Sequence, residues 1–261
     1  MAVKQETTKK ILNDIIILRN AGRFEEAVEL AMKSFRNTKN NCFNNEIYNC
    51  FISQNKRSEA IKILIKMIKY EPDNLSLKKK LAHHYFLLGD YKNALKYYKK
   101  VTDYEPAKPE NQYNTGMMYH YLKDRQKAYL HYRNALNIDP KYTPALNNIG
   151  LLYFESNDFE KAVEIFKKTV SSAPHSPEAY HHLGVIQRVY YNDEELSLLY
   201  LKKAIRLDPE YADNYYQLAL TYNKYGKKQE TITTLQKCLE LCPQHNQAKQ
   251  LLGKITENKS L

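Results

Sequence analysis

The stretch that decides the fold is residues 143–176, which read TPALNNIGLLYFESNDFEKAVEIFKKTVSSAPHS. In each half a small residue, Gly150 or Ala162, comes three or four positions before a large aromatic one, and Pro174 lies near the end. Because proline lacks the backbone donor and its ring clashes with the preceding turn, it cannot continue a helix. Pro174 therefore marks the end of a helix, and the stretch predicts two helices that form one hairpin.

The same arrangement recurs along the chain. Prolines follow one another at intervals of 34 or 35 residues, at positions 72, 106, 140, 174, 209 and 243. When each proline is taken as position 32 of a unit, position 20 holds a small residue: Ala60, Ala94, Ala128, Ala162, Ser197 and Thr231. Position 8 is small in all units but one and reads Tyr48, Ala82, Gly116, Gly150, Gly184 and Ala219. Chance does not place six units in phase, so the chain is built from an internal repeat.

This pattern resembles the tetratricopeptide repeat (TPR), in which L-G-x-x-Y is followed by A-x-x-x-F and then by proline within 34 residues. The resemblance extends over about residues 8–256. It implies an all-α fold, a right-handed TPR superhelical solenoid of antiparallel helix hairpins with a C-terminal capping helix. Seven units, counted from residue 8 to the last proline at 243, are expected at about 8–40, 41–74, 75–108, 109–142, 143–176, 177–211 and 212–245. A capping helix is expected at 246–256, and residues 1–7 and 257–261 are expected to be flexible.

The physical reason for the pattern is close packing between helices. Small residues at positions 8 and 20 let the two helices of a hairpin cross closely, and aromatic residues fill the space between neighbouring hairpins. Tyr48 stands at position 8 of the second unit, so we expect this unit to be splayed or differently packed. The sixth unit has one extra residue, which we place in the turn at 190–195 and interpret as a tolerated longer turn rather than a contact site.

No catalytic motif is recognisable in the sequence. It lacks a glycine-rich phosphate loop, an HExxH segment and a paired-carboxylate motif. The adjacent histidines at 83–84 and at 181–182 point to different helix faces and do not chelate one ion. The four cysteines, at 42, 50, 238 and 242, form no CxxC pair. We therefore expect a protein that is not an enzyme and that has neither a cofactor nor a metal site.

The beginning of the chain carries no recognisable targeting or membrane segment. The first ten residues are polar, and the apolar run at 15–18 is too short for a signal-peptide core or a membrane span. No transmembrane segment is expected, and a cytoplasmic location follows by default.

The positive charge of the chain is unevenly distributed. The net charge is +11, and residues 56–100 hold 12 Lys and Arg against 4 Asp and Glu. Such a segment is either a solvated outer face, which is the commoner case, or a surface that attracts an acidic partner, a polyanion or a membrane.

The resemblance also implies a binding groove. In TPR proteins the first helix of each unit lines the concave face, and ligands lie against positions such as 5, 6, 9 and 12. Position 5 reads, from the third unit onward, Lys79, Tyr113, Asn147, His181 and Tyr216. Position 6 includes Asn114, Asn148, His182 and Gln217, position 9 includes His83, Met117, Leu151, Val185 and Leu220, and position 12 of the sixth unit is Arg188. The expected surface therefore changes from basic to amide and apolar along the chain.

The amides at position 6 resemble the asparagine ladder of the repeats in O-linked N-acetylglucosamine transferase. A primary amide both donates and accepts hydrogen bonds, so this row would pair with the backbone of an extended peptide. Asparagine is also common at this position in generic TPR units. The aliphatic row at position 9 would take apolar anchors of the same partner. The acidic-tail clamp of chaperone-binding members is not matched, because Pro144 and Asn148 stand where Lys and Arg are required.

Three functions are compatible with these residues. The favoured one is a scaffold or adaptor that binds a peptide or helix of a partner protein in the groove. The second is a polyanion binder that uses residues 56–100, although nucleic acid is a less favoured partner because helical repeats that read RNA lack this small-residue and proline signature. The third is a homo-oligomer that assembles through a free edge or the convex face.

Overall fold

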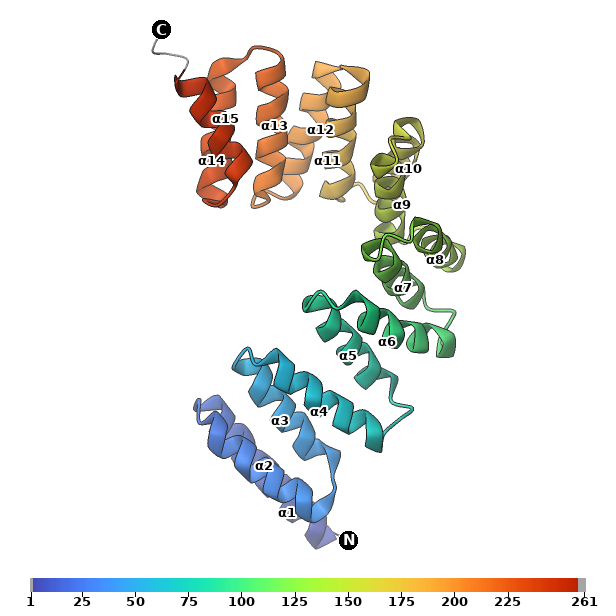
Figure 1. Ribbon diagram of the computed structural model, residues 1–261, viewed down its shortest axis with the longest axis vertical. Coiled ribbons are helices and arrows are strands. Elements are labelled where there is room, and N and C mark those ends of the chain that lie inside the picture. The colour runs from blue at the N-terminus through green and yellow to red at the C-terminus, as the bar shows by residue number, and fades with distance from the viewer. Residues whose placement is uncertain (1, 258–261) are drawn as a thin grey trace. The chain divides into compact units, whose positions relative to one another are not determined.

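The computed structural model describes the backbone of residues 2–257 and the side chains of residues 6–256. Over this range the chain consists of helices joined by short turns, with no strand (Figure 1). A π-helical turn, η1 (Gln187–Tyr191), continues α11. The α-helices are α1 (Ala2–Asn20), α2 (Phe24–Thr38), α3 (Asn41–Ser53), α4 (Arg57–Tyr70), α5 (Leu75–Leu87), α6 (Tyr91–Tyr104), α7 (Pro109–Tyr121), α8 (Arg125–Ile138), α9 (Thr143–Glu155), α10 (Phe159–Ser172), α11 (Pro177–Ile186), α12 (Glu194–Leu207), α13 (Ala212–Lys224), α14 (Lys228–Leu241) and α15 (Asn246–Glu257).

The helices form two compact units, an N-terminal unit (Met1–Asp124) and a C-terminal unit (Arg125–Leu261). In the N-terminal unit α1 pairs with α2, α3 with α4 and α5 with α6, and α7 packs on α6. In the C-terminal unit α8 packs on α9, and three hairpins follow, α9–α10, α11–α12 and α13–α14. Within each unit the hairpins stack in chain order (Figure 1). This is the arrangement of a helical solenoid, in which each hairpin buries its apolar face against its neighbours.

The predicted all-α architecture of antiparallel helix hairpins is confirmed, and so is the capping helix. The capping helix is α15, which packs on α14. Its Ala248 is completely buried beside Leu235 and Cys238 of α14. The last hairpin is therefore covered by one further helix, as a solenoid end requires.

The N-terminal boundary differs from the prediction. Helix α1 begins at Ala2, so residues 2–7 are part of a helix. The reason is that this segment contains neither proline nor glycine and is rich in good helix formers. The predicted tail at 257–261 starts with the last residue of α15, and its other residues lie outside the described range.

Close crossings within a hairpin depend on the small residues. A Cβ atom on Gly150 would lie 2.7 Å from Cε1 of Phe166, and a Cβ atom on Gly184 would lie 2.6 Å from Cγ of Leu201. Both distances are far below van der Waals contact, so at these two crossings only glycine fits without a shift of its neighbour. Position 20 is completely buried in all six units, at Ala60, Ala94, Ala128, Ala162, Ser197 and Thr231.

Tyr48 shows how the second unit accommodates a large residue at a small-residue position. Its hydroxyl lies 2.7 Å from Nε2 of His84, and the two rings meet edge to face with their centroids 5.6 Å apart. The side chain therefore reaches from α3 to α5 of the next hairpin. The packing of the second repeat thus differs from that of the others by this contact between Tyr48 and His84 of the next hairpin.

The extra residue of the sixth unit is absorbed by η1. A π-helical turn holds one residue more than an α-helical turn, so it accommodates an insertion without lengthening the loop. The backbone oxygen of Gln187 accepts a hydrogen bond from the N–H of Asn192, five residues later, and another from the N–H of Asp193 at 2.9 Å. The interpretation of the insertion as a longer turn at 190–195 is therefore wrong.

Candidate peptide-binding site

In the N-terminal unit, the predicted groove residue Lys79 is already engaged. Its Nζ lies 3.3 Å from Oε2 of Glu105. Lys108 donates a hydrogen bond to the same carboxylate at 2.7 Å. The pKa of Glu105 is lowered to about 2, and this hydrogen bond makes the largest contribution to the shift. The other predicted residues on α7 are partly buried: Tyr113, Asn114 and Met117.

His83 belongs to a basic cavity that the sequence pattern did not reveal. The cavity has a volume of ≈ 250 Å³ and lies between the end of α3, the start of α4 and the middle of α5. No carboxylate is among its lining residues. Such a concentration of positive charge in a concave site favours an anion. The lining residues are Tyr48, Ile52, Asn55, Arg57, Lys80, His83, His84 and Leu87.

His84 gives this basic cavity an unusual polar group. The residue is buried, its Nε2 meets the hydroxyl of Tyr48, and its Nδ1 has no hydrogen-bond partner among the described residues. Burial, followed by the nearby charges of His83, Arg57 and Lys80, lowers the pKa of His84. The imidazole is therefore neutral at pH 7, and one of its nitrogens is unpaired.

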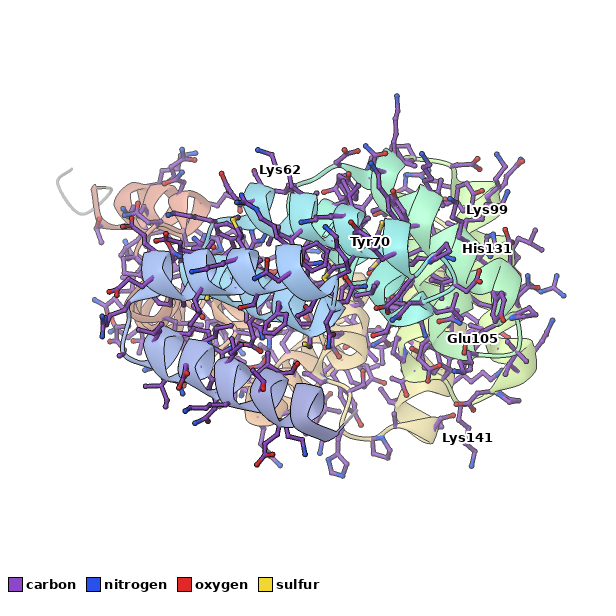
Figure 2. All side chains as sticks on the ribbon, turned by 90° about the horizontal axis from the view of Figure 1, so that it is seen from below. Lys62, Tyr70, Lys99, Glu105, His131 and Lys141 are labelled. Atoms are coloured by element: carbon purple, nitrogen blue, oxygen red, sulfur yellow. The ribbon has the colours of Figure 1, made fainter. Side chains whose placement is uncertain are left out.

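Other parts of the basic segment face solvent. Lys62 and Lys99 are exposed and stand at the outside of the ribbon (Figure 2). Lys62 and Lys99 therefore belong to the expected solvated outer face. The basic cavity is the place where residues of the 56–100 segment line a concave site.

In the C-terminal unit, two residues at position 6 have different surroundings. Nδ2 of Asn148 donates to the backbone oxygen of Pro144 at 3.0 Å, within α9. The imidazole of His182 stacks on the ring of Phe166 with the centroids 4.9 Å apart. Burial lowers the pKa of His182 to about 3, so this side chain is a neutral packing group. At position 6 the C-terminal unit therefore has a partly exposed amide at Asn148 and a packing group at His182.

Gln217, the third residue at position 6, forms a pair with Arg188 of η1. Nη2 of Arg188 donates to Oε1 of Gln217 at 2.7 Å, and Nζ of Lys224 donates to the backbone oxygen of Arg188 at 2.7 Å. Nε of Arg188 is buried and has no hydrogen-bond partner among the described residues, and burial lowers the pKa of its guanidinium. Buried polar groups in folded proteins are nearly always hydrogen-bonded. This donor therefore calls for an acceptor from outside the chain.

Two residues at position 5 join neighbouring hairpins. Nδ2 of Asn147, on α9, donates to Oγ of Ser176 at 3.1 Å. Nδ1 of His181, on α11, lies 2.7 Å from Oδ1 of Asn214 on α13. These contacts fix successive first helices of the units against each other.

The remaining predicted residues of the C-terminal unit provide apolar surface. Leu151 and Leu220 are partly exposed, whereas Val185 is buried. The ring of Tyr216 packs against that of His245 with the centroids 4.6 Å apart. Apolar anchors of a partner would therefore reach Leu151 and Leu220 more readily than Val185.

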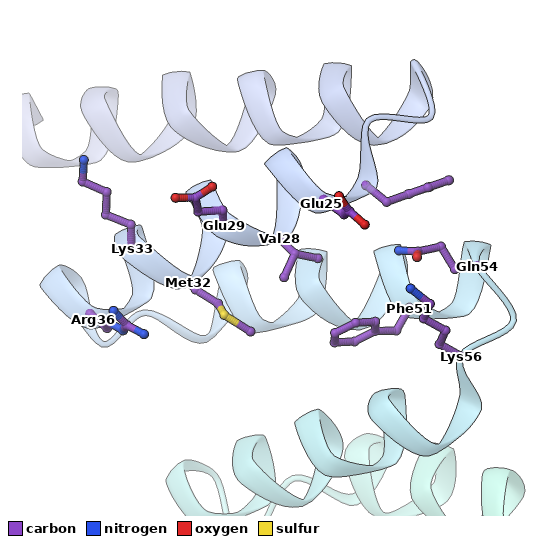
Figure 3. A pocket seen from close by; sticks show the side chains of 10 residues that line it. Glu25, Val28, Glu29, Met32, Lys33, Arg36, Phe51, Gln54 and Lys56 are labelled. Carbon is purple, nitrogen blue, oxygen red and sulfur yellow. The ribbon is translucent and has the colours of Figure 1, made fainter.

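A larger cavity in the N-terminal unit lies outside the predicted groove. It has a volume of ≈ 640 Å³, and Val28 and Met32 of α2 face Phe51 of α3 across it (Figure 3). Residues four apart on a helix share a face, so the spacing of Val28 and Met32 is the sequence signal for this cavity. Charged residues of both signs stand around it: Glu25, Glu29, Lys33, Arg36 and Lys56.

A comparison with protein families decides what kind of repeat this is. The model of the cilia and flagella-associated protein 70 middle TPR-like domain matches residues 78–242, which is more than half of the chain. The chain belongs to this TPR-like family.

Several solved structures are similar to this TPR-like chain, and one of them is described as a tetratricopeptide repeat protein. A tetratricopeptide repeat protein from Parabacteroides merdae has a TM-score of 0.74 at 17% sequence identity, covering 97% of this chain and 99% of that chain. The APC/C hetero-tetramer Cut9-Hcn1 has a TM-score of 0.69 at 17% identity, covering 92% of this chain and 48% of that chain. The TPR-like chain thus spans about half the length of that relative. MamA has a TM-score of 0.55 at 24% identity, covering 64% of this chain and 97% of that chain.

These identities are low, so the structural likeness shows the fold alone. The search of the curated proteins found no match. The family match and the fold together confirm the predicted TPR family and TPR solenoid.

Other features of the TPR-like chain concern membranes, metals and thiols. Within residues 2–257 no helix combines the length and the apolar character that a bilayer span requires. Among the described side chains, no group of three or more His, Cys, Asp or Glu residues is placed to hold a metal ion. All four cysteines are free, and burial raises the pKa of Cys238 to about 11. Such a thiol is a packing group and not a nucleophile.

Proposed function

We propose that the chain is a non-catalytic scaffold or adaptor that binds a peptide or helix of a partner protein along α9, α11 and α13 of the C-terminal unit. The TPR-type repeat fold is consistent with a protein-interaction scaffold. Successive first helices of the units, joined through their position 5 side chains, would form a continuous surface for such a ligand.

The observation that carries the proposal is a pair of unsatisfied donors. Nε of Arg188 and Nδ2 of Asn214 are both buried without a hydrogen-bond partner among the described residues. In each side chain the other end is bonded, Arg188 to Gln217 and Asn214 to His181. These bonds hold the donors in place, and the carbonyl oxygens of a bound peptide are strong acceptors that would satisfy them.

The test compares capture of a partner by two variants. The partner is first identified by affinity capture with the wild-type chain and mass spectrometry. The double variant Asn148→Ala/Gln217→Ala removes both position 6 amides of the C-terminal unit. The control Asn137→Ala/Gln229→Ala removes two exposed amides from α8 and α14 of the same unit. Because all four residues are at least partly exposed on helices, circular dichroism should show unchanged helicity.

We expect the double variant to lose the partner and the control to retain it. If the double variant captures the same partner with the same strength, the proposed binding surface is wrong.

The basic cavity favours a second candidate, the binding of a polyanion by the N-terminal unit. Arg57, Lys80 and His83 line this cavity without a carboxylate. Fluorescence anisotropy with labelled heparin or single-stranded RNA at increasing salt would test it. Release of counterions makes the logarithm of such an affinity fall linearly with the logarithm of salt concentration. An affinity that does not change with salt would rule this candidate out.

Two further predictions from the sequence stay predictions, the cytoplasmic location and the homo-oligomer. Sedimentation of the purified chain at increasing concentration would test the second. A monomer at all concentrations would exclude assembly through a free edge.

A further inference from the structure

An acidic cavity lies in the C-terminal unit, between the first turns of α11 and α13. Its volume is ≈ 440 Å³. No lysine or arginine lines it, although the chain carries a net charge of +11. It is therefore a local negative site on a positive protein. Its polar lining includes Glu178, His181, Asp208, Tyr211, Asp213 and Asn214.

Two of the three carboxylates keep most of their capacity to accept hydrogen bonds. Oε2 of Glu178 accepts one, from Oγ of Ser176 at 3.1 Å. Oδ1 of Asp208 accepts one, from the backbone N–H of Glu210 at 3.3 Å. A carboxylate accepts about four hydrogen bonds, so both groups have room for donors of a ligand.

The third carboxylate, Asp213, is less engaged still. Its oxygens lie 3.6 Å from Nε2 of His181 and 3.6 Å from Nε2 of His245. These distances are longer than a hydrogen bond. Among the described side chains no donor reaches Asp213 within hydrogen-bond distance.

Asn214 is the independent sign that this cavity takes a ligand. The side chain is 1% exposed, its Oδ1 lies 2.7 Å from Nδ1 of His181, and its Nδ2 has no partner among the described residues. The equivalent residue of the fourth unit, Asn111, gives an internal comparison, because its Nδ2 donates to the backbone oxygen of Glu105 at 3.0 Å. The corresponding donor is thus satisfied inside the protein there, and in the acidic cavity it is not.

Tyr211 adds an aromatic surface to the carboxylates. It is 51% exposed, and its ring centroid lies 6.1 Å from that of His181. The face of a tyrosine attracts a cation, and arginine stacks on aromatic rings more often than lysine does. The cavity therefore combines negative charge with a stacking surface for a flat cationic group.

We infer that the acidic cavity binds an arginine side chain of the partner peptide, and this inference rests on the proposed function. The guanidinium lies among Glu178, Asp208 and Asp213, and Nδ2 of Asn214 donates to a carbonyl oxygen of the same peptide. Arginine fits better than lysine because its five N–H donors form a rigid fork that pairs with carboxylates, whereas lysine offers a compact point charge.

The test is a titration of the full chain with a small probe, N-acetyl-L-arginine N-methylamide, which carries the guanidinium and two backbone amides. The matched probe is the citrulline analogue, which has the same shape and no charge. NMR spectra of the labelled protein report the side-chain amide of Asn214 and the backbone amides of α11 and α13. We expect saturable shifts at these resonances with the arginine probe and weaker binding, by at least about tenfold, with citrulline, as for loss of one hydrogen bond between charged groups.

Variants of the protein provide the second arm. Glu178→Gln/Asp213→Asn should weaken binding of the arginine probe by roughly tenfold or more. The control Glu230→Gln/Glu240→Gln removes two exposed carboxylates from α14, changes the net charge equally and should bind as the wild type does. Circular dichroism checks that both variants fold. Equal binding of the two probes, or equal binding by the two double variants, would overturn the inference.

The failure of this inference is distinguishable from the failure of the proposed function. If Asn148→Ala/Gln217→Ala abolishes capture of the partner while the arginine probe binds no better than citrulline, the binding surface stands and the arginine site is wrong. If the arginine probe binds as expected while the double alanine variant captures its partner unchanged, the arginine site stands and the amide surface is wrong.

Discussion

Replacing Gly184 with alanine should loosen the contact between α11 and α12. The added Cβ would lie 2.6 Å from Cγ of Leu201 and 3.2 Å from its backbone nitrogen. The first atom is the branch point of the side chain and the second belongs to the backbone, so neither moves out of the way easily. A hydrogen bond also joins α11 and α12 at this crossing. Ser197 is completely buried, and its Oγ donates to the backbone oxygen of Gly184 at 2.9 Å.

Two opposing effects set the magnitude. Inserting a methyl group into a well-packed interior costs about 1–3 kcal/mol. Alanine in a helix interior is favoured over glycine by about 1 kcal/mol. The difference between the two effects is at most about 2 kcal/mol. Because the added Cβ would lie only 2.6 Å from Cγ of Leu201, the expected net loss in the free energy of unfolding is in the upper part of this range, about 1–2 kcal/mol.

Urea unfolding followed by circular dichroism would measure this loss, and hydrogen exchange would locate it in α11 and α12. A double-mutant cycle with Leu201→Ala isolates the contact, because truncating Leu201 removes the atom that the new methyl group meets. Gly184→Ala should therefore cost less in the Leu201→Ala background. A variant as stable as the wild type, or the same cost in both backgrounds, would refute the crossing argument.

Three further predictions follow from the surroundings of Tyr48, Glu105 and His182, and single variants or a pH titration would test them. Tyr48→Phe removes the hydrogen bond to His84 and should destabilise the N-terminal unit by about 1 kcal/mol, measured by urea unfolding; an unchanged midpoint would show that the bond adds nothing. Hydrogen bonds from Lys108, which is the largest cause, and from Asn111 and Lys79 lower the pKa of Glu105 from 4.5 to about 2. The stabilising contribution of this carboxylate is therefore present above about pH 4.5 and is lost as the pH falls toward 2. Glu105→Gln should flatten that part of the acid-unfolding curve, and an unaltered curve would contradict the assignment. Burial lowers the pKa of His182 from 6.5 to about 3, so the contribution of its neutral form is complete above about pH 6.5 and declines as the pH falls toward 3. Its NMR signal should keep the neutral position through pH 5, and a titration midpoint near 6.5 would show that the ring is solvated.

The repeat pattern predicted the hairpins because it records contacts that most repeats make in the same way. Gly150 meets Phe166 at the same kind of helix crossing at which Gly184 meets Leu201, so the spacing of these residues in the sequence reflects the geometry. The boundary at Ala2 was missed because α1 continues beyond the repeat pattern. The π-helical turn was missed because one extra residue fits either a loop or a helix, and backbone hydrogen bonds decide between them.

The candidate site was less predictable, because its chemistry depends on contacts between neighbouring repeats of the C-terminal unit. Repeat position predicted that His181 and Gln217 lie on the first helices of their repeats, whereas their contacts with Asn214 and Arg188 followed only from the structure. The acidic cavity is lined by the start of α11, by the connection between α12 and α13, and by the start of α13. Neither Asp208 nor Asn214 occupies a position that the family pattern marks for ligands.

The π-helical turn has a consequence for how the gene tolerates change. Inserting one codon into an α-helix rotates everything that follows by about 100°, because the helix has 3.6 residues per turn. In this chain the π-helical turn at 187–191 takes up the extra residue, so the helix that follows is not rotated. Ser197 of α12 still contacts the backbone of Gly184. An in-frame insertion at the end of α11 is therefore nearly silent for the stacking downstream, whereas the same insertion within α12 would turn its buried face toward solvent.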